Sequence, residues 1–236
     1  SKSVFAPDQP KTLADTGLTM VTMRDIMLKT MFRQNLDKVT ELSKVLAMQV
    51  PMVHVLVVLC RDLKLIEAMG TLSAGAGSNE MGYQLSDAGK ARALDALAQS
   101  EYYGAMPVPL DVYKEQVKRQ SIRNIMLTRQ ALTAAMGHLI LPPGLLDQLG
   151  PAVTSGKSIL MYGPPGNGKT TISESVGRVV LGQTLYIPFA IDIDGQIVRV
   201  FDSVNHEVME EDEEIGTGRA SNRPDPRWIK IRRPMI

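Results

Sequence analysis

Apolar residues recur between positions 18 and 63 with the period of amphipathic helices. Beginning at Leu18, they are spaced three and four residues apart, which predicts a first helix. Asp37 suits the N-cap of a second helix, because its carboxylate can accept hydrogen bonds from the first backbone N–H groups. Pro51 suits the first turn of a third helix, where the N–H that proline lacks is not needed. The pattern therefore predicts three helices joined by short turns.

A change of period after residue 64 predicts a β-hairpin and a fourth helix. The stretches LIEAM at 65–69 and YQL at 83–85 are typical of strands, and the glycine-rich segment 70–82 between them is typical of a mobile loop. Ser86 or Asp87 is then expected to cap the helix AGKARALDALAQS.

Two proline-containing segments indicate how the chain is divided. Residues 1–17 contain two prolines and no apolar period, so they predict an extended arm that needs a partner or a groove to become ordered. Pro107 and Pro109 favour an extended connector, which we place at 105–112. This predicts one domain over 18–104 and a second over 113–236.

The second domain combines predicted helices with strand-like apolar runs. A segment with helical spacing and a basic outer face precedes a proline pair, and a short helix, GLLDQLGPAV, follows at 144–153. The run KSILMY at 157–162 predicts a buried strand. Farther along, YIPFAIDIDG at 186–195 predicts a second strand, with a hairpin into QIVRVFD at 196–202.

The motif with the clearest chemistry follows the run KSILMY. Gly163, Gly168, Lys169 and Thr170 match G-x-x-x-x-G-K-[ST] residue for residue, and helical spacing continues from Thr171. Glycines allow backbone dihedrals that a Cβ forbids, so that successive N–H groups can point at phosphate oxygens. The candidate nucleotide-binding residues are Gly163, Pro164, Pro165, Gly166, Asn167, Gly168, Lys169, Thr170 and Thr171.

Two side chains of this loop have specific expected roles. Lys169 is the candidate catalytic residue, because its compact positive charge can reach the β- and γ-phosphates of a nucleotide. The Thr170 hydroxyl is the candidate Mg²⁺ ligand, and the N-terminus of the helix that follows favours negative charge. The expected cofactors are ATP and Mg²⁺.

The stretch SILMYGPPGNGKTT, with a helix before and after it, resembles the AAA+ ATPases. The resemblance implies an α/β P-loop NTPase fold with a parallel sheet, and an ATP-driven homo-oligomeric ring that is usually a hexamer. It also implies that adenine is held partly by the segment upstream of the loop, which corresponds to 137–141 here. The general likeness is to uncharacterised bacterial ATPases.

The chain departs from this family downstream of the loop. The family has a strand that ends in an acidic pair, then a polar sensor and a trans-acting arginine. The only candidate for the pair includes Asp192, but Pro188 interrupts the strand and isoleucine follows the aspartate. Since the chain stops at the strand-like segment WIKIRRPMI, we expect it to be the front part of a longer ATP hydrolase that binds ATP more credibly than it hydrolyses it alone.

The order of three helices, a hairpin and a closing helix over about residues 18–100 resembles the winged-helix family. In such regulators the third helix and the hairpin present basic residues to DNA. Here the third helix reads PMVHVLVVLCRDLK, the hairpin has no Lys or Arg between Met69 and Leu85, and residues 18–112 hold nine basic and ten acidic residues. We therefore expect this α+β domain to contact a protein rather than DNA.

Composition favours a cytoplasmic protein without a membrane span. There are 26 basic and 25 acidic residues, so net charge gives no pull toward nucleic acid or anionic lipid. One cysteine cannot form an internal disulfide, and the longest aliphatic run is far shorter than the ~20 residues that cross a bilayer.

Near the C-terminus, six acids at 207–216 precede six bases at 218–233. This pattern is typical of a solvated excursion whose charges attract each other, and an interaction loop is the alternative. Trp228 is expected to anchor a loop to a core, with stacking on a nucleic-acid base as the alternative.

Together these features predict an AAA+ ATPase that remodels a protein partner or assembly, with the winged helix as adaptor. An ATP-controlled DNA-binding regulator is one alternative. A nucleotide switch without hydrolysis is another.

Overall fold

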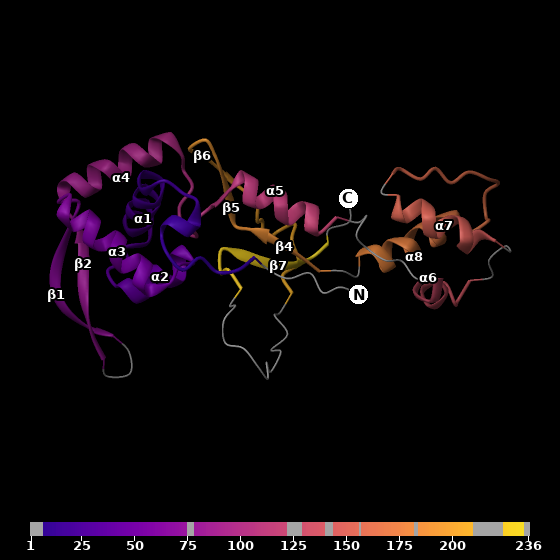
Figure 1. Cartoon of the computed structure of the whole chain (residues 1–236), viewed down its shortest axis with the longest axis horizontal. Coiled ribbons are helices and arrows are strands. Elements are labelled where there is room, and N and C mark those ends of the chain that lie inside the picture. The colour runs from indigo at the N-terminus through magenta and orange to yellow at the C-terminus, as the bar shows by residue number, and fades with distance from the viewer. Residues whose placement is uncertain are drawn as a thin grey trace.

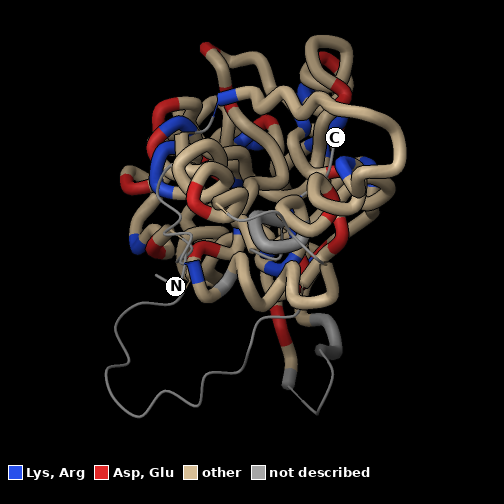
Figure 2. The backbone as a smooth tube through the Cα atoms, turned by 90° about the vertical axis from the view of Figure 1, so that its right-hand side faces the viewer, with Lys and Arg blue, Asp and Glu red and all other residues tan. Residues whose placement is uncertain are grey.

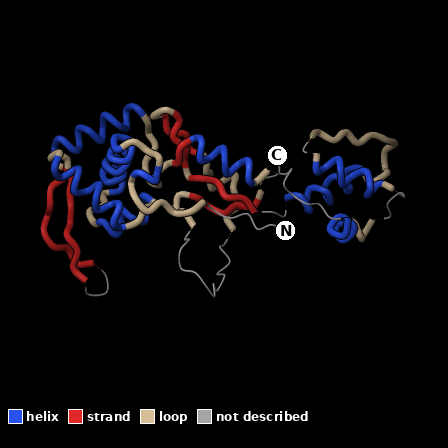
Figure 3. The backbone as a smooth tube through the Cα atoms, in the orientation of Figure 1, coloured by secondary structure: helices blue, strands red, loops and turns tan. Residues whose placement is uncertain are grey.

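The computed structural model describes residues 7–74, 78–121, 129–139, 144–155, 157–181, 184–209 and 224–233. Helices and a long hairpin occupy one end of the molecule, short strands occupy the middle, and three helices form the other end (Figures 1 and 3). Basic and acidic residues are interspersed along the chain in Figure 2, in keeping with a net charge of +1.

The first end has the predicted order of elements. Its helices and strands are α1 (Met20–Gln34), α2 (Val39–Leu46), α3 (Val50–Asp62), β1 (Ile66–Ala74), β2 (Ser78–Leu85) and α4 (Asp87–Gln99). Their apolar sides form one core that includes Met27, Leu42 and Leu56, all with no exposed surface. Burial of these faces supplies most of the stability of helices this short.

Two local predictions in this region were wrong. Lys38, not Asp37, occupies the N-cap of α2, and its side chain makes no capping hydrogen bond. The hairpin strands are also longer than expected, since β1 and β2 pair from Ile66 with Leu85 to Ala74 with Ser78. The ladder continues because Gly70, with φ of 102°, takes up a bulge rather than ending the strand. Only 75–77 of the expected loop lies outside the described residues.

The junction between β2 and α4 follows the predicted cap. The Ser86 hydroxyl accepts a hydrogen bond from the Gly89 N–H at 3.0 Å and donates to the Lys64 carbonyl at 2.7 Å. A Cβ on Gly89 would lie 1.9 Å from the Leu65 carbonyl oxygen. Glycine at this position therefore allows α4 to start directly against the backbone of Leu65, just before β1.

The described part of the N-terminal arm is hydrogen-bonded to a distant segment of its own chain. The Pro7 carbonyl accepts from the Asp225 N–H at 2.9 Å, and Leu13 packs on the main core. A short 3₁₀ helix, Ala14–Thr16, ends the arm. The arm is thus ordered by the segment at 224–228, more than 200 residues later in the sequence.

The segment 105–112 is packed against both halves of the chain. Met106 and Val108 have no exposed surface, and the Met106 N–H donates to the Leu46 carbonyl at 2.8 Å. Strand β3 (Val108–Pro109) and helix α5 (Leu110–Arg119) follow without a break. The domain boundary here stays a prediction, but the connector is well anchored.

The central strands form two small sheets. Strand β3 pairs in parallel with β5 (Ala190–Ile193), and β5 pairs antiparallel with β6 (Gln196–Arg199), which is the predicted hairpin. Strand β4 (Thr184–Pro188) pairs antiparallel with β7 (Trp228–Arg232). Among the described residues, these strands do not form the parallel sheet that the resemblance implied. Strands β4 and β7 pair with each other, and β5 pairs with β3 and β6.

Trp228 has the predicted anchoring role. Its side chain is 5% exposed and belongs to a small core with Val108 and Ile191. Its strand β7 has β4 as a partner, so the C-terminal apolar segment is paired rather than left open. Stacking of this indole on a nucleic-acid base was the wrong alternative. Most of the acidic stretch, from residue 210, lies outside the described residues.

The third group of elements contains helices α6 (Arg129–Ala135), α7 (Leu145–Thr154) and α8 (Lys169–Leu181). They enclose a core of Leu132, Met136, Leu149 and Ile172. In the sequence this group lies between α5 and β4. At that junction the Gln120 side chain makes two hydrogen bonds to the Tyr186 backbone. The Gln120 amide donates to the Tyr186 carbonyl at 3.0 Å and accepts from its N–H at 2.6 Å.

Within the described ranges, no single helix has the length and apolar composition to cross a membrane. The pair α2 and α3 passes such a test only when taken together across a bend of 112°.

Candidate nucleotide-binding site

The glycine-rich loop forms the turn that leads into α8. Gly163, Gly166 and Gly168 have φ values of 150°, 86° and 70°, a region that residues with a Cβ rarely adopt. A Cβ at any of the three would meet nothing within 4 Å. The backbone conformation, and not crowding by neighbouring atoms, therefore requires glycine at these positions. The open space around the loop leaves room for a ligand beside its N–H groups.

Helix α8 begins immediately after the loop. The Ile172 N–H makes the first helical hydrogen bond, to the Gly168 carbonyl at 2.9 Å. The N–H groups of Lys169, Thr170 and Thr171 come before it and have no acceptor within the helix. These three donors, together with the positive end of the helix dipole, form an environment that favours an anion.

The Lys169 side chain curls back over the loop. Its ammonium donates to the Gly163 carbonyl at 2.9 Å and to the Pro164 carbonyl at 2.6 Å. The positive charge is thus held between the first residues of the loop and the start of α8. A phosphate bound to the N–H groups of the loop would lie within reach of this ammonium.

Apolar contacts on the opposite side of α8 anchor the loop. Ile172 belongs to the core of the three-helix group, and Val176 and Met161 pack against it. The Ser175 hydroxyl donates to the Thr171 carbonyl at 2.7 Å inside α8. Thr170 lies on the exposed side. Its hydroxyl can therefore be reached by a metal ion that accompanies a phosphate.

The strand predicted before the loop is absent. Residues 157–162 have no regular structure, and Leu160 and Tyr162 are 86% and 91% exposed. A buried parallel strand needs hydrogen-bonding neighbours. Here β4 and β5, the next strands along the chain, have other partners. The prediction of a buried strand was therefore wrong.

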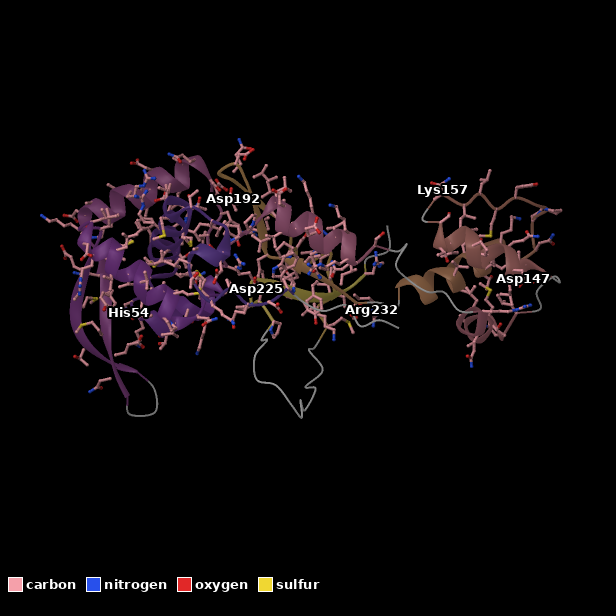
Figure 4. The ribbon with its side chains drawn as sticks, viewed as in Figure 1. His54, Asp147, Lys157, Asp192, Asp225 and Arg232 are labelled. Carbon is pink, nitrogen blue, oxygen red and sulfur yellow. The ribbon has the colours of Figure 1, made fainter. Side chains whose placement is uncertain are left out.

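The structure separates the loop from the acidic residues of the β5–β6 turn. The Asp192 carboxylate accepts from the Gly195 N–H at 2.8 Å and so stabilises that turn. Figure 4 shows Asp192 in the part of the molecule away from Asp147 and Lys157, which belong to the three-helix end. No group of three or more His, Cys, Asp or Glu among the residues described is placed to hold a metal ion.

The segment expected near adenine lies close to the same core. Leu139 packs against the apolar cluster that contains Ile172, and its N–H donates to the Met136 carbonyl at 2.8 Å. Residues 140 and 141 fall outside the described ranges. The sequence did not predict the carbonyls of Gly163 and Pro164 as partners of Lys169, because every residue has a backbone carbonyl and residue type does not show which one accepts a hydrogen bond.

Comparison with known proteins gives two partial relatives. The vesicular-fusion protein sec18 of Schizosaccharomyces pombe is 29% identical over 90 residues, which are 35% of this chain and 11% of that protein. The vesicle-fusing ATPase of Dictyostelium discoideum is 38% identical over 55 residues, which are 23% of this chain and 7% of that protein. These matches support an AAA+ ATPase relationship.

The AAA+ relationship covers only part of the chain and a small part of each relative. No protein-family model matches this sequence. No solved structure matches it either. The relationship supports a P-loop NTPase fold, whereas the central strands described here form two small sheets, and the parallel pairing is the short one between β3 and β5.

Proposed function

We propose that this chain is the ATP-binding part of an AAA+ ATPase that couples ATP binding and hydrolysis to the remodelling of a protein partner or assembly. The observation that carries the proposal is the glycine loop with positive φ at Gly163, Gly166 and Gly168, at the start of α8 and under the Lys169 ammonium. The relatives, one of which is named an ATPase, support it.

The proposed cofactors are ATP and Mg²⁺. The loop N–H groups, Lys169 and the N-terminus of α8 would hold the phosphates, and the Thr170 hydroxyl would ligate the metal ion. Bound Mg²⁺ neutralises charge on the β- and γ-phosphates. Hydrolysis further needs an acidic group near the attacking water, and a homo-oligomeric ring would supply an arginine from a neighbouring subunit.

Calorimetric titration of ATP, ADP and GTP with Mg²⁺ tests nucleotide binding directly. We expect saturable binding of ATP and ADP at one site, with GTP weaker, because the resemblance to AAA+ ATPases implies an adenine contact at 137–141. The proposal is wrong if none of the three nucleotides binds to this chain.

Thr170→Ala is expected to weaken ATP binding in Mg²⁺ by about tenfold and to change binding in EDTA very little. The reason is that the substitution removes a metal-ligating hydroxyl but leaves the loop backbone in place. Paired titrations in Mg²⁺ and in EDTA measure both effects. Thr133→Ala, at an exposed position of α6, is the control. Equal losses with and without Mg²⁺ would contradict the metal role of Thr170.

We further propose that residues 18–104 are a winged-helix adaptor for a protein. The outward side of α3 and the hairpin carries exposed apolar side chains: Val55 and Leu63 are 53% and 50% exposed, and Met69 and Met81 are exposed as well. Exposed apolar side chains suit a protein surface, whereas DNA needs basic residues here. This favours the protein adaptor over the DNA-binding regulator.

A further inference from the structure

An aromatic groove lies between the first helical group and the central strands. It has a volume of about 980 Å³ and is lined by the end of α2, residues 102–105 and residues 199–203. The chain has only four phenylalanines, and two of them, Phe189 and Phe201, line this groove together with Tyr102 and Tyr103. Aromatic side chains are therefore concentrated here, although they are scarce in the chain.

The aromatic rings are held in place by the backbone around them. The Phe189 carbonyl accepts from the N–H groups of Val200 and Phe201 at 3.0 and 3.2 Å. The two phenylalanine rings meet edge to face, with centroids 5.5 Å apart. The Tyr102 hydroxyl donates to the Ala105 carbonyl at 2.6 Å. One face of the Phe201 ring is stacked on the His206 ring, with centroids 5.9 Å apart. Phe189, Phe201 and Tyr103 still keep part of their surface accessible, so a planar ligand can stack on these rings.

Basic side chains line the same groove and the hollow that adjoins it. Lys44 and Arg199 line the groove, and Arg33 lines the smaller hollow that shares Tyr102, Tyr103 and Arg199 with it. The Arg199 guanidinium lies 5.8 Å from the centre of the Tyr102 ring. All three basic residues are exposed, and none of them forms an ion pair with a described residue.

Two acidic residues, Asp202 and Glu101, lie at the same surface. The Asp202 carboxylate accepts from the Val204 N–H at 2.9 Å and from the Asn205 amide at 2.6 Å. These hydrogen bonds lower the pKa of Asp202, and they direct its charge into the turn at 202–205. The groove and the adjoining hollow therefore hold three basic side chains against two acidic ones, an excess of one positive charge.

We propose that this groove binds single-stranded nucleic acid. Bases would stack on Tyr103, Phe189 and Phe201, and the phosphates would lie along Arg33, Lys44 and Arg199. Proteins that bind single strands without sequence preference combine stacking rings with a basic groove in this way. The basic side chains favour a polyanion over a proline-rich peptide, which is the other ligand that aromatic grooves accept.

This site is independent of the glycine loop. It uses side chains from both halves of the chain, and it does not involve the outward side of α3, where basic residues are scarce. A double helix would bind less well than a single strand, because paired bases cannot open onto the rings. Binding of nucleic acid in this groove does not require ATP, so it can be measured apart from the proposed ATPase activity.

Fluorescence anisotropy with labelled ten-nucleotide oligo-dT and oligo-A RNA tests the proposal. We expect a Kd of roughly 10⁻⁶–10⁻⁴ M that weakens as salt is raised, as for binding without sequence preference. Tyr103→Ala and Arg199→Ala should each weaken binding by about tenfold, since a stacked base contributes about that much. Arg61→Ala, at an exposed position of α3, is the matched charge control and should bind as the original chain does.

Three outcomes would overturn the proposal. The first is no oligonucleotide binding at low salt. The second is equal binding of a poly-glutamate peptide that Tyr103→Ala does not change, which would indicate attraction of any polyanion. The third is displacement by free AMP at the same concentration as the oligonucleotide, which would indicate a mononucleotide site. Lys169→Ala should leave oligonucleotide affinity unchanged, so failure at the loop and failure at the groove can be told apart.

Discussion

Lys169→Ala is expected to lower the affinity for ATP by at least about a hundredfold. The substitution removes an ammonium that would make charge-assisted hydrogen bonds to two phosphates, each contributing about 1.5–3 kcal/mol. Among the described residues, the Lys169 side chain bonds only to the carbonyls of Gly163 and Pro164, and these can turn to water when it is removed. The fold should therefore be preserved while binding is lost.

Calorimetric titration of ATP, with circular dichroism as the check on folding, measures this effect. Lys157→Ala is the matched control, because it removes the same charge from the same part of the chain, outside the loop. We expect it to bind ATP as the original chain does. Unchanged ATP affinity in Lys169→Ala would contradict the assignment of the loop. Equal losses of ATP affinity in both variants would show a general effect of removing positive charge and not a specific role of Lys169.

Arg227→Ala should destabilise the fold by about 3–5 kcal/mol, the usual result of leaving a buried charge without its partner. Arg227 and Asp225 are 3% and 2% exposed and form an ion pair of 2.8 Å. The guanidinium also donates to the carbonyls of Thr16 and Pro107, at 3.4 and 3.2 Å. One side chain thus joins the N-terminal arm, the connector and the C-terminal strand, and its loss is a large fraction of a typical 5–15 kcal/mol.

Urea unfolding monitored by circular dichroism measures the loss. Arg232→Ala is the matched control: its ion pair with Glu207 is exposed, and such pairs contribute about 1 kcal/mol or less. If Arg227→Ala does not fold, the double change Asp225→Asn with Arg227→Met provides the test. It removes both charges and should recover part of the stability. Equal stabilities of the Arg227 and Arg232 variants would show that the buried pair contributes little.

The spacing of apolar residues predicted helices correctly wherever a helix has one apolar side. The spacing of Met23, Met27 and Met31 predicted α1, and all three are buried. The Ser86 cap, Pro51 in the first turn of α3, and the hairpin of β5 and β6 were also confirmed. Each of these depends on residues within a few positions of one another, which is why a single sequence contains the information. The winged-helix assignment rests on the order of these elements and stays a prediction.

The errors concern features that depend on distant partners. The run at 157–162 has strand composition but no strand beside it, and it lies exposed before the loop. The glycine-rich segment after Met69 was predicted to be a loop, yet most of it pairs across the hairpin, because the bulge between Ala68 and Gly70 shifts the register and pairing continues beyond it. Composition cannot reveal either result, since both depend on which strand lies alongside.

The sequence by itself determined the chemistry of the candidate loop. Its glycines, lysine and threonine stand at spacings that phosphate binding requires, and their residue types alone indicate nucleotide. Only the tertiary structure decided that Arg227 joins three distant segments and that four aromatic rings form one basic groove. The physical reason is distance along the chain. A loop and its helix are local and follow from neighbouring residues, whereas buried ion pairs and grooves arise when packing brings remote residues together.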